Sequence, residues 1–171
     1  NAAVPVSIRG PGEDRAWGNR MTSWVVGLGT DHEDPLERLA TVRHHTAVAK
    51  RIDAQRDLTL QHDWMDYWPL FKIYTSWLPA LGQRFTGHPS YSLIASSVPG
   101  PRTPLYRDGA RLAKIISMGP LLFPFGLNFT GWSYVDDLTI GVVACREHVP
   151  DIWHLANGLT LELEELAGSV G

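Results

Sequence analysis

The chain has 171 residues, of which 44% are hydrophobic and 19% charged, and its formal net charge at pH 7 is −3. This length allows one domain with a real core, and a pI near 6.2 argues against nucleic-acid binding, which needs a clustered basic surface. The single cysteine, Cys145, excludes an internal disulfide and a cysteine-rich metal site, and no apolar stretch reaches the roughly 18 residues of a membrane span.

Two strands are predicted near the start of the chain. Residues 4–9 alternate well enough to form the first strand, and Pro5 favours a sheet edge or a strand start because proline donates no hydrogen bond. Residues 21–28 are predicted to form the second strand and end at Gly29.

A helix is predicted from Pro35 to about Ile52. Asp34 is a typical N-cap residue, Pro35 suits the first helical position, and Glu37 is placed to complete a capping box. Helical spacing predicts one narrow apolar face, formed by Leu36, Leu39, Ala40 and Ala47.

Residues 63–85 form the most apolar and aromatic segment, interrupted by Pro69 and Pro79. Its apolar surface is too broad for an ordinary one-sided surface helix. A buried core helix is the first interpretation, the wall of a channel for a long apolar ligand is the second, and a membrane-interface element is the third.

The stretch from Tyr91 to Gly109 holds the most distinctive local pattern. A strand over residues 91–96 is predicted to stop at the corner formed by residues 99–101, Pro-Gly-Pro, because proline cannot continue a hydrogen-bonded ladder. Gly100 allows close approach to its backbone, so this corner can form the wall of a pocket, although a simple structural turn is the alternative.

Further along, residues 105–109 are predicted to form a turn, residues 110–118 a strand and residues 120–126 a loop against the core. Residues 128–135 and 138–145 are predicted to form a hairpin with Asp136-Asp137 as its two-residue turn.

Alternation along residues 128–135 separates two faces. One face carries Asn128, Thr130, Trp132 and Tyr134, and the other carries Phe129, Gly131, Ser133 and Val135. Asn128 and Thr130 need polar partners on a strand this apolar, and these are either neighbouring backbone groups or a polar ligand.

Residues 149–151 are predicted to open the last helix. Its apolar positions are Ile152, Leu155, Ala156, Leu159, Leu163 and Leu166, and its solvated face holds Glu162, Glu164 and Glu165. Together the elements predict an α/β domain with a mixed sheet flanked by helices.

Familiar catalytic patterns are missing from the sequence. It has no glycine-rich phosphate loop, no Gly-x-Ser-x-Gly motif and no set of residues with metal-ligand spacing. His44 and His45 point about 100° apart on a helix, which makes them poor joint ligands for one metal ion, and they are interpreted as solvated helix residues.

Several segments together resemble a known family. They are residues 4–9 (Val-Pro-Val-Ser-Ile-Arg), 18–20 (Gly-Asn-Arg), 34–39 (Asp-Pro-Leu-Glu-Arg-Leu), 97–106 (Ser-Val-Pro-Gly-Pro-Arg-Thr-Pro-Leu-Tyr) with Gly109-Ala110, 127–134 (Leu-Asn-Phe-Thr-Gly-Trp-Ser-Tyr) and 149–151 (Val-Pro-Asp). In this order they are similar to the C-terminal half of the bacterial wax ester synthase/diacylglycerol acyltransferase family, and the similarity spans nearly the whole chain.

The resemblance implies a half-domain like those of chloramphenicol acetyltransferase, in an enzyme that moves a fatty acyl group from acyl-CoA to a fatty alcohol or a diacylglycerol. It implies that the substrate tunnel runs between two halves. The general base is expected to be the second histidine of a His-His-x-x-x-Asp-Gly motif in the N-terminal half.

No catalytic residue is assigned to this chain, because its only His-His pair, His44-His45, is followed by Thr-Ala-Val-Ala-Lys. The Asn-Asp motif that the family usually carries just before the first strand is also missing, and Ser97 stands where the family commonly has Asn. The candidates for the substrate tunnel are Ser97, Pro99, Gly100, Asn128, Thr130, Ser133 and Tyr134. No metal and no cofactor are expected, with acyl-CoA acting as a substrate.

Residues 1–171 are interpreted as a single C-terminal acyltransferase domain, either a fragment or a processed subunit, because Asn1 stands close to a strand. The expected partners are the N-terminal half, acyl-CoA and a lipid alcohol or diacylglycerol. The expected location is cytoplasmic, with peripheral contact to membranes or lipid droplets. The alternatives are a non-catalytic lipid-binding or partner-binding module that keeps the fold, and an interfacial anchor formed by residues 63–85.

Overall fold

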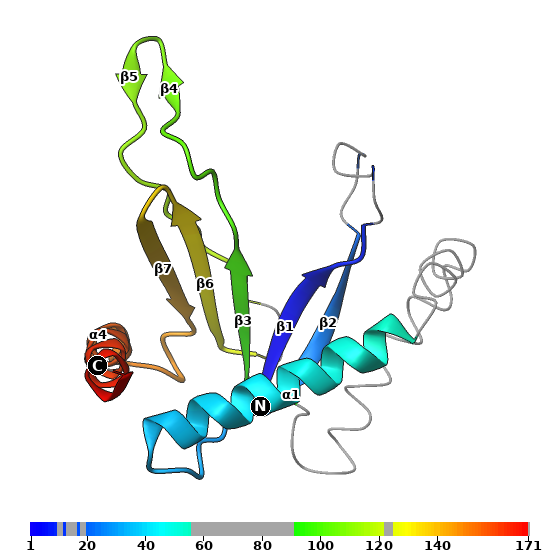
Figure 1. The fold of residues 1–171 in the computed structure, drawn as a ribbon. Coiled ribbons are helices and arrows are strands. Elements are labelled where there is room, and N and C mark those ends of the chain that lie inside the picture. The colour runs from blue at the N-terminus through cyan, green and yellow to red at the C-terminus, as the bar shows by residue number, and fades with distance from the viewer. Residues whose placement is uncertain (10–11, 13–16, 18–19, 56–90, 122–124, 171) are drawn as a thin grey trace.

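A computed structural model describes residues 1–9, 12, 17, 20–55, 91–121 and 125–170. They form a five-stranded sheet with the strand order β2-β1-β3-β6-β7, two long helices and a small two-stranded sheet, β4-β5 (Figure 1). The main strands are β1 (Ala2–Ser7), β2 (Met21–Val26), β3 (Leu93–Val98), β6 (Leu127–Tyr134) and β7 (Asp137–Ala144). The helices are α1 (Pro35–Ala54) and α4 (Ile152–Val170), and the small sheet is β4 (Tyr106–Arg107) with β5 (Ala110–Arg111).

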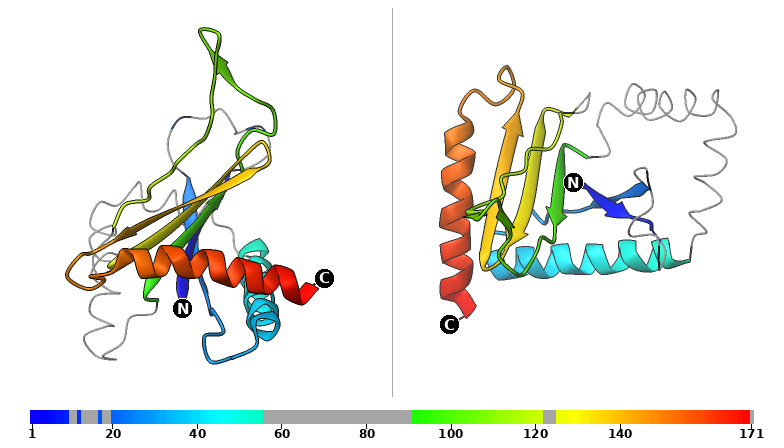
Figure 2. Two further views of the ribbon diagram at one scale, coloured as in Figure 1. Left: turned by 90° about the vertical axis from the view of Figure 1, so that its left-hand side faces the viewer. Right: turned by 90° about the horizontal axis from the view of Figure 1, so that it is seen from above.

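The sheet is mixed, which confirms the predicted fold class. β3 is parallel to both of its neighbours, β1 and β6, whereas the outer strands β2 and β7 are antiparallel to the strands beside them. α1 contacts β2, α4 contacts β7, and the two helices contact each other (Figure 2).

β1 and β3 separate soon after they meet. Their pairing covers only Ala2 with Leu93 and Ala3 with Ile94, whereas β3 and β6 stay paired along residues 94–98. Figure 1 shows the two strands diverging from this point. The prediction that Pro5 marks a sheet edge or a strand start was wrong, because β1 begins at Ala2 and lies between β2 and β3. Pro5 is tolerated there because β3 no longer pairs with this part of β1.

The Pro-Gly-Pro corner follows β3 directly. β3 begins and ends two residues later than predicted, and it stops at Val98, immediately before Pro99. The Gly100 N–H donates to Ser133 Oγ at 3.0 Å, and the Pro101 carbonyl accepts from the Val135 N–H at 2.9 Å. A Cβ on Gly100 would overlap the Ser133 carbonyl oxygen, so only glycine allows the corner to sit this close to β6.

The β6–β7 hairpin turns one residue earlier than predicted. Tyr134 pairs with Asp137, so the two turn residues are Val135 and Asp136 rather than Asp136-Asp137. Val135 has a φ of 55°, a left-handed conformation that β-branched residues rarely adopt. In this conformation the Val135 N–H donates a hydrogen bond to the Pro101 carbonyl. We attribute the shifted turn to this tertiary contact, which the local sequence does not reveal.

The turn predicted at residues 105–109 is confirmed only at Asp108 and Gly109, because Tyr106 and Arg107 form β4. It connects β4 to β5 through Asp108 and Gly109, whose φ values are 50° and 80°. Positive φ at both central residues is the geometry of a tight hairpin turn, and Asp-Gly is one of the sequences that favour it.

The strand predicted over residues 110–118 was wrong beyond Arg111. Residues 112–121, called the strap below, have no regular structure, and residues 117–120 lie against the sheet. A Cβ on Gly141 of β7 would overlap the Ser117 carbonyl oxygen, and a Cβ on Gly119 would meet side chains of β6. The backbone of this segment therefore crosses a sheet face instead of pairing at a sheet edge, and its large side chains Ile116 and Met118 are 68% and 74% exposed.

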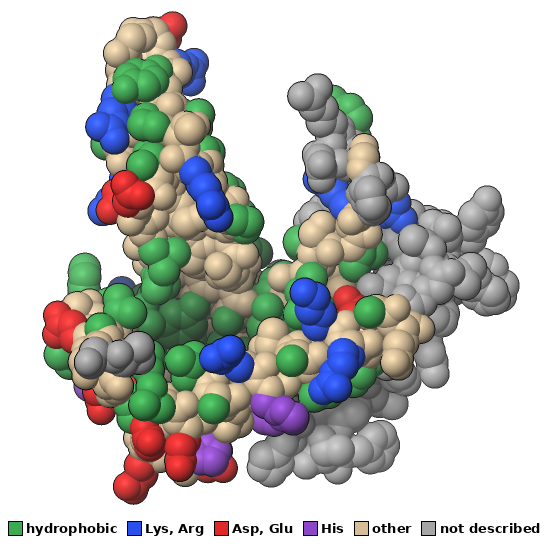
Figure 3. All heavy atoms as spheres, viewed as in Figure 1, with side chains coloured by type: hydrophobic (Ala, Val, Ile, Leu, Met, Phe, Trp, Pro, Cys, Tyr) green, Lys and Arg blue, Asp and Glu red, His purple; other side chains and the backbone are tan. Residues whose placement is uncertain are grey.

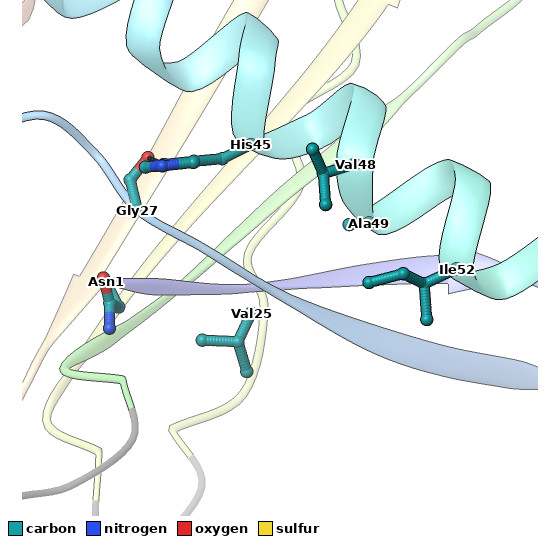
Figure 4. A pocket seen from close by; sticks show the side chains of 7 residues that line it. All are labelled: Asn1, Val25, Gly27, His45, Val48, Ala49 and Ile52. Atoms are coloured by element: carbon teal, nitrogen blue, oxygen red, sulfur yellow. Dashed lines mark hydrogen bonds between the residues drawn. The ribbon is translucent and has the colours of Figure 1, made fainter.

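α1 begins as predicted, because the Asp34 carboxylate accepts from the Leu36 N–H at 2.8 Å. Glu37 lies 3.5 Å from His32 Nδ1, a contact outside the predicted capping box. The predicted apolar face was wrong, because its members Leu36, Leu39, Ala40 and Ala47 are all exposed. The side chains that approach β2 are instead those of His45, Val48, Ala49 and Ile52 (Figure 4).

The last helix, α4, confirms its prediction. Asp151 caps it by accepting from the His154 N–H at 3.1 Å. Arg38 Nη1 of α1 lies 3.0 Å from Glu162 Oε2, so one of the predicted solvated glutamates joins the two helices. Leu163, expected on the apolar face, is 66% exposed.

Few apolar side chains are buried in the described part of the chain. They are Ala2, Ala3, Val26, Ile94 and Tyr134. Large apolar side chains are exposed on α1 and α4, including Leu36, Leu39, Trp153 and Leu161. Among the described helices, none has both the length and the apolar character that crossing a membrane requires. The interpretations of residues 63–85 lie outside the described residues.

Replacing Gly100 with alanine is expected to destabilise the fold by about 1–3 kcal/mol, because the added Cβ meets rigid backbone at Ser133. Gly158→Ala is the matched control, since nothing lies within 4 Å of its Cβ position and alanine favours a helix by about 0.5–1 kcal/mol. Urea unfolding midpoints measure both effects. Equal stability of the two variants would contradict the close packing of the corner.

Candidate functional site

The candidate site is a cavity of about 330 Å³ at the opening between β1 and β3. On one side of the opening it is lined by Ala3, Pro5 and Ser23, and on the other by Ile94, Ser96 and Val98. Because β1 and β3 are paired only at residues 2–3, no hydrogen-bonded ladder closes the sheet at this point.

Asn128 and Thr130 on β6 form the polar part of the cavity wall. They are only 2% and 5% exposed. The Asn128 amide donates to the Pro120 carbonyl at 2.9 Å, and the Thr130 hydroxyl donates to Asn128 Oδ1 at 2.9 Å. The two side chains thus satisfy each other and the backbone of the strap, which was one of the two predicted outcomes, while they also face the cavity.

Gly119 brings the strap close to these side chains. A Cβ at Gly119 would lie 2.5–2.7 Å from polar atoms of Asn128 and Thr130, which is closer than real Cβ contacts. Gly119, Pro120 and Ser117 line the cavity along with β6. The strap therefore contributes backbone as well as side chains to the cavity wall.

The cavity has the chemistry of a binding wall. Among the described residues that line it, none is Asp, Glu, His, Lys, Arg or Cys, and the polar groups are hydroxyls, backbone and the Asn128 amide. Such a wall suits an apolar ligand with a polar group at one point. General acid–base chemistry at this cavity would need a group outside these lining residues.

The predicted tunnel residues of β6 divide between the two faces of the sheet. Asn128, Thr130 and Tyr134 alternate on the cavity face, but only Asn128 and Thr130 line the cavity. The Tyr134 hydroxyl accepts from the Leu105 N–H at 2.9 Å and donates to the Leu112 carbonyl at 3.0 Å. Tyr134 thus ties together the two arms that lead to the β4–β5 hairpin.

The other predicted tunnel residues lie away from the cavity lining. Ser97 is exposed and pairs with Gly131, which puts it on the face opposite Asn128. Ser133 shares that opposite face and bonds to Gly100, while Pro99 is exposed at the corner. The set proposed from sequence therefore does not form one continuous surface.

The two histidines of α1 lie at a different place. His44 is exposed, and His45 Nδ1 lies 3.2 Å from the Gly27 carbonyl oxygen in a separate hollow beside β2 (Figure 4). Neither residue lines the cavity that contains Asn128. Within the described ranges, no group of three His, Cys, Asp or Glu side chains could hold a metal ion.

Ser96 and Gly119 belong to the cavity wall but were not among the predicted site residues. Ser96 pairs with Thr130 across the parallel strands β3 and β6. Alternation along the strand predicts that Ile94, Ser96 and Val98 share one face. Which residues of β6 lie beside them depends on the strand register, which a single sequence does not reveal.

Cys145 and His148 form a second pair of reactive side chains, at the turn between β7 and α4. The His148 N–H donates to the Cys145 carbonyl at 3.1 Å. Hydrogen bonding to the His148 side chain, with a smaller contribution from the Glu147 backbone, lowers the pKa of the Cys145 thiol below its ordinary value. The same side-chain bond raises the pKa of His148.

Comparison with known proteins finds a family model, described as the WS/DGAT C-terminal domain, that matches residues 17–167. Among curated relatives, a provisionally named diacylglycerol O-acyltransferase of Mycobacterium tuberculosis H37Rv is 36% identical over 167 residues, covering 96% of this chain and 33% of the relative. O-acyltransferase WSD of Acinetobacter baylyi is 32% identical over 172 residues, covering 99% of this chain and 36% of the relative.

A solved structure is similar as well. The wax ester synthase/diacylglycerol acyltransferase from Marinobacter aquaeolei VT8 matches with a TM-score of 0.66 and 27% identity, over 84% of this chain and 34% of that protein. The chain thus spans about a third of the length of the relatives that it matches.

Removing the Asn128 amide should cost about 2–3 kcal/mol of stability in Asn128→Ala, because the Pro120 carbonyl and the Thr130 hydroxyl both lose their partner. Thr130→Val should cost about 1–2 kcal/mol, and the double variant should cost less than the sum because the two share one bond. Chemical denaturation of the four proteins measures this coupling. Thr139→Val, at a half-exposed site on β7, serves as a control; strict additivity would contradict the network.

Cys145 should react with iodoacetamide faster near neutral pH than an ordinary thiol, because a lower pKa leaves more thiolate at that pH. In His148→Ala the thiol pKa should rise, so the alkylation rate should fall near neutral pH and the two rates should converge at alkaline pH. Mass spectrometry reads the reaction without ambiguity since Cys145 is the only cysteine. Identical pH profiles for both proteins would refute the interaction.

Proposed function

Since the chain belongs to the WS/DGAT C-terminal domain family, we propose that it forms the C-terminal half of an acyl-CoA-dependent O-acyltransferase that makes triacylglycerols or wax esters. The names of the relatives, diacylglycerol O-acyltransferase and wax ester synthase, support this activity. Acyl-CoA is then a substrate, and the reaction needs no further cofactor.

The observation that carries the proposal is the cavity at the opening of the sheet. It joins an apolar lining, from residues such as Ile94 and Val98, to the buried polar pair Asn128 and Thr130. This combination suits a lipid chain whose reacting polar end must be held at one point. We propose that Asn128 and Thr130 form part of the tunnel wall, and that the tunnel follows the face of the sheet on which they lie.

The proposed reaction is attack of an acceptor hydroxyl on the thioester carbonyl of acyl-CoA, which forms an ester and releases the CoA thiol. A general base must take the hydroxyl proton as the new C–O bond forms, and that proton ends on the departing thiol. The described cavity residues include no histidine or carboxylate. The resemblance to the family implies that the base belongs to the His-His-x-x-x-Asp-Gly motif of an N-terminal half, and we propose the same here.

An N-terminal half is also the proposed cover for much of the exposed apolar surface. Leu36 and Leu39 on α1 and Trp153 and Leu161 on α4 are exposed by 40–74%. We propose that these side chains contact the N-terminal half. Since both substrates are lipids or carry a lipid chain, we also propose that the enzyme works in the cytoplasm in peripheral contact with membranes or lipid droplets.

Reconstitution tests the proposal. The full chain, mixed with an N-terminal half carrying the His-His motif, should make ester from radiolabelled palmitoyl-CoA and either hexadecanol or dioleoylglycerol in detergent micelles, whereas neither half alone should do so. Turnover by this chain alone would contradict the assignment of the general base to the N-terminal half. Binding between the halves without turnover would favour a non-catalytic lipid-binding or partner-binding module.

Two adjacent substitutions identify the face that forms the tunnel. Ser96→Leu fills part of the cavity and should lower the turnover of long-chain substrates about tenfold or more, since it blocks their path. Ser97→Leu makes the same chemical change on the opposite, exposed side of β3 and should stay within about twofold of the unmodified protein. The reverse order of effects would place the tunnel on the Ser97 face.

A further inference from the structure

The β4–β5 hairpin projects beyond the end of the main sheet (Figure 1). Tyr134 ties its two arms together at the base, through Leu105 and Leu112. Residues 102–114 are exposed throughout, including the apolar side chains Leu105, Tyr106 and Leu112 at 43%, 65% and 38%. Figure 3 shows apolar and basic side chains together on this projection.

The hairpin is basic in a chain whose net charge is negative. Residues 102–114 hold four basic side chains, Arg102, Arg107, Arg111 and Lys114, and a single acid, Asp108. In the described part of the chain, Arg107 is the only one of the four with a carboxylate nearby, Asp108 at 3.8 Å, and both side chains are about 95% exposed. The hairpin therefore presents a local positive charge of about three, whereas the chain as a whole carries −3.

Arginine and large apolar side chains occur on both faces of the hairpin. Tyr106 pairs with Arg111, so these two share one face, and Arg107 pairs with Ala110 on the other. The Leu112 N–H bonds to the Leu105 carbonyl, which continues the ladder and adds two leucines to the Arg107 face. An arm that docked flat on a protein would be expected to bury one apolar face and expose one charged face. This hairpin instead has the same mixed character all round.

A lipid surface suits that mixed character. At the boundary of a bilayer, tyrosine and leucine side chains enter the interface while arginine and lysine reach the phosphate groups, and this environment surrounds an inserted tip on all sides. We infer that the β4–β5 hairpin is the element by which this protein binds an anionic phospholipid surface, with Tyr106 entering the interface and Arg102, Arg107, Arg111 and Lys114 contacting lipid phosphates. This inference deepens the peripheral membrane contact proposed above by naming the site.

Vesicle flotation tests the inference. The full chain should float with phosphatidylcholine vesicles that contain 30% phosphatidylglycerol, and should bind much less to pure phosphatidylcholine vesicles. Arg107→Gln/Arg111→Gln should weaken the partition coefficient by ~30-fold, at roughly fivefold for each basic residue near an anionic surface. Arg43→Gln/Arg51→Gln on the exposed side of α1 removes the same charge and should stay within about twofold. Equal losses in the two double variants, or no binding by the unmodified chain, would overturn the inference.

Insertion of the tip is measured separately. In a Cys145→Ser background, a bimane label on Tyr106→Cys should shift to the blue when anionic vesicles are added, whereas the same label on Thr160→Cys, exposed on α4, should not. Addition of the N-terminal half without lipid should leave the Tyr106 label in a polar environment. A blue shift produced by that half alone would assign the hairpin to a protein interface and overturn the lipid assignment.

These measurements are independent of acyl transfer. The vesicle assays contain no acyl-CoA, and the esterification assay uses detergent micelles. Arg107→Gln/Arg111→Gln should therefore keep reconstituted ester synthesis in micelles while losing vesicle binding. If the unmodified chain binds vesicles but gives no turnover in micelles with the N-terminal half, the proposed function is contradicted and the hairpin inference stands.

Discussion

The brief pairing of β1 with β3 governs the architecture of this domain. Only residues 2–3 of β1 are paired with β3, while β3 remains paired with β6 along residues 94–98. The two strands part beside Pro5, which carries no N–H for a ladder. The cavity lies on one face of the sheet across this opening, where alternate residues of β1, β3 and β6 line it. The short pairing of β1 with β3 therefore sets the position of the opening that the cavity spans.

The cavity wall depends on a second interaction, because Asn128 and Thr130 stand on a face of the sheet where water would reach them unless another segment covered it. Asn128 and Thr130 are buried because the strap covers them, and the strap is held there by the Asn128 bond to Pro120. Gly119 makes this close approach sterically possible. Buried amide and hydroxyl groups are costly when unpaired, so the strap and β6 stabilise each other. The result is a polar point fixed in an otherwise apolar surface.

Local signals in the sequence predicted most of the elements. The Asp34-Pro35 start of α1, the alternation along β6, the stop at Pro99 and the start of α4 at Asp151 each depend on a residue and its immediate neighbours, and all were found. The errors share a different cause. The apolar face of α1, the turn at Val135 and the strap depend on contacts between segments far apart in the chain. The cavity itself depends on strand register, which places Ser96 beside Thr130 and Ser97 on the opposite side.

The hydrogen bonds of the Tyr134 hydroxyl connect two distant parts of the domain. It accepts from Leu105 and donates to Leu112, so the hairpin cannot tilt on its base without straining one of these two bonds. The strap begins at Leu112 and reaches Pro120, whose carbonyl oxygen accepts a hydrogen bond from the Asn128 amide. The segment from Leu112 to Pro120 thus links the β4–β5 hairpin at one end to the buried Asn128 amide at the other.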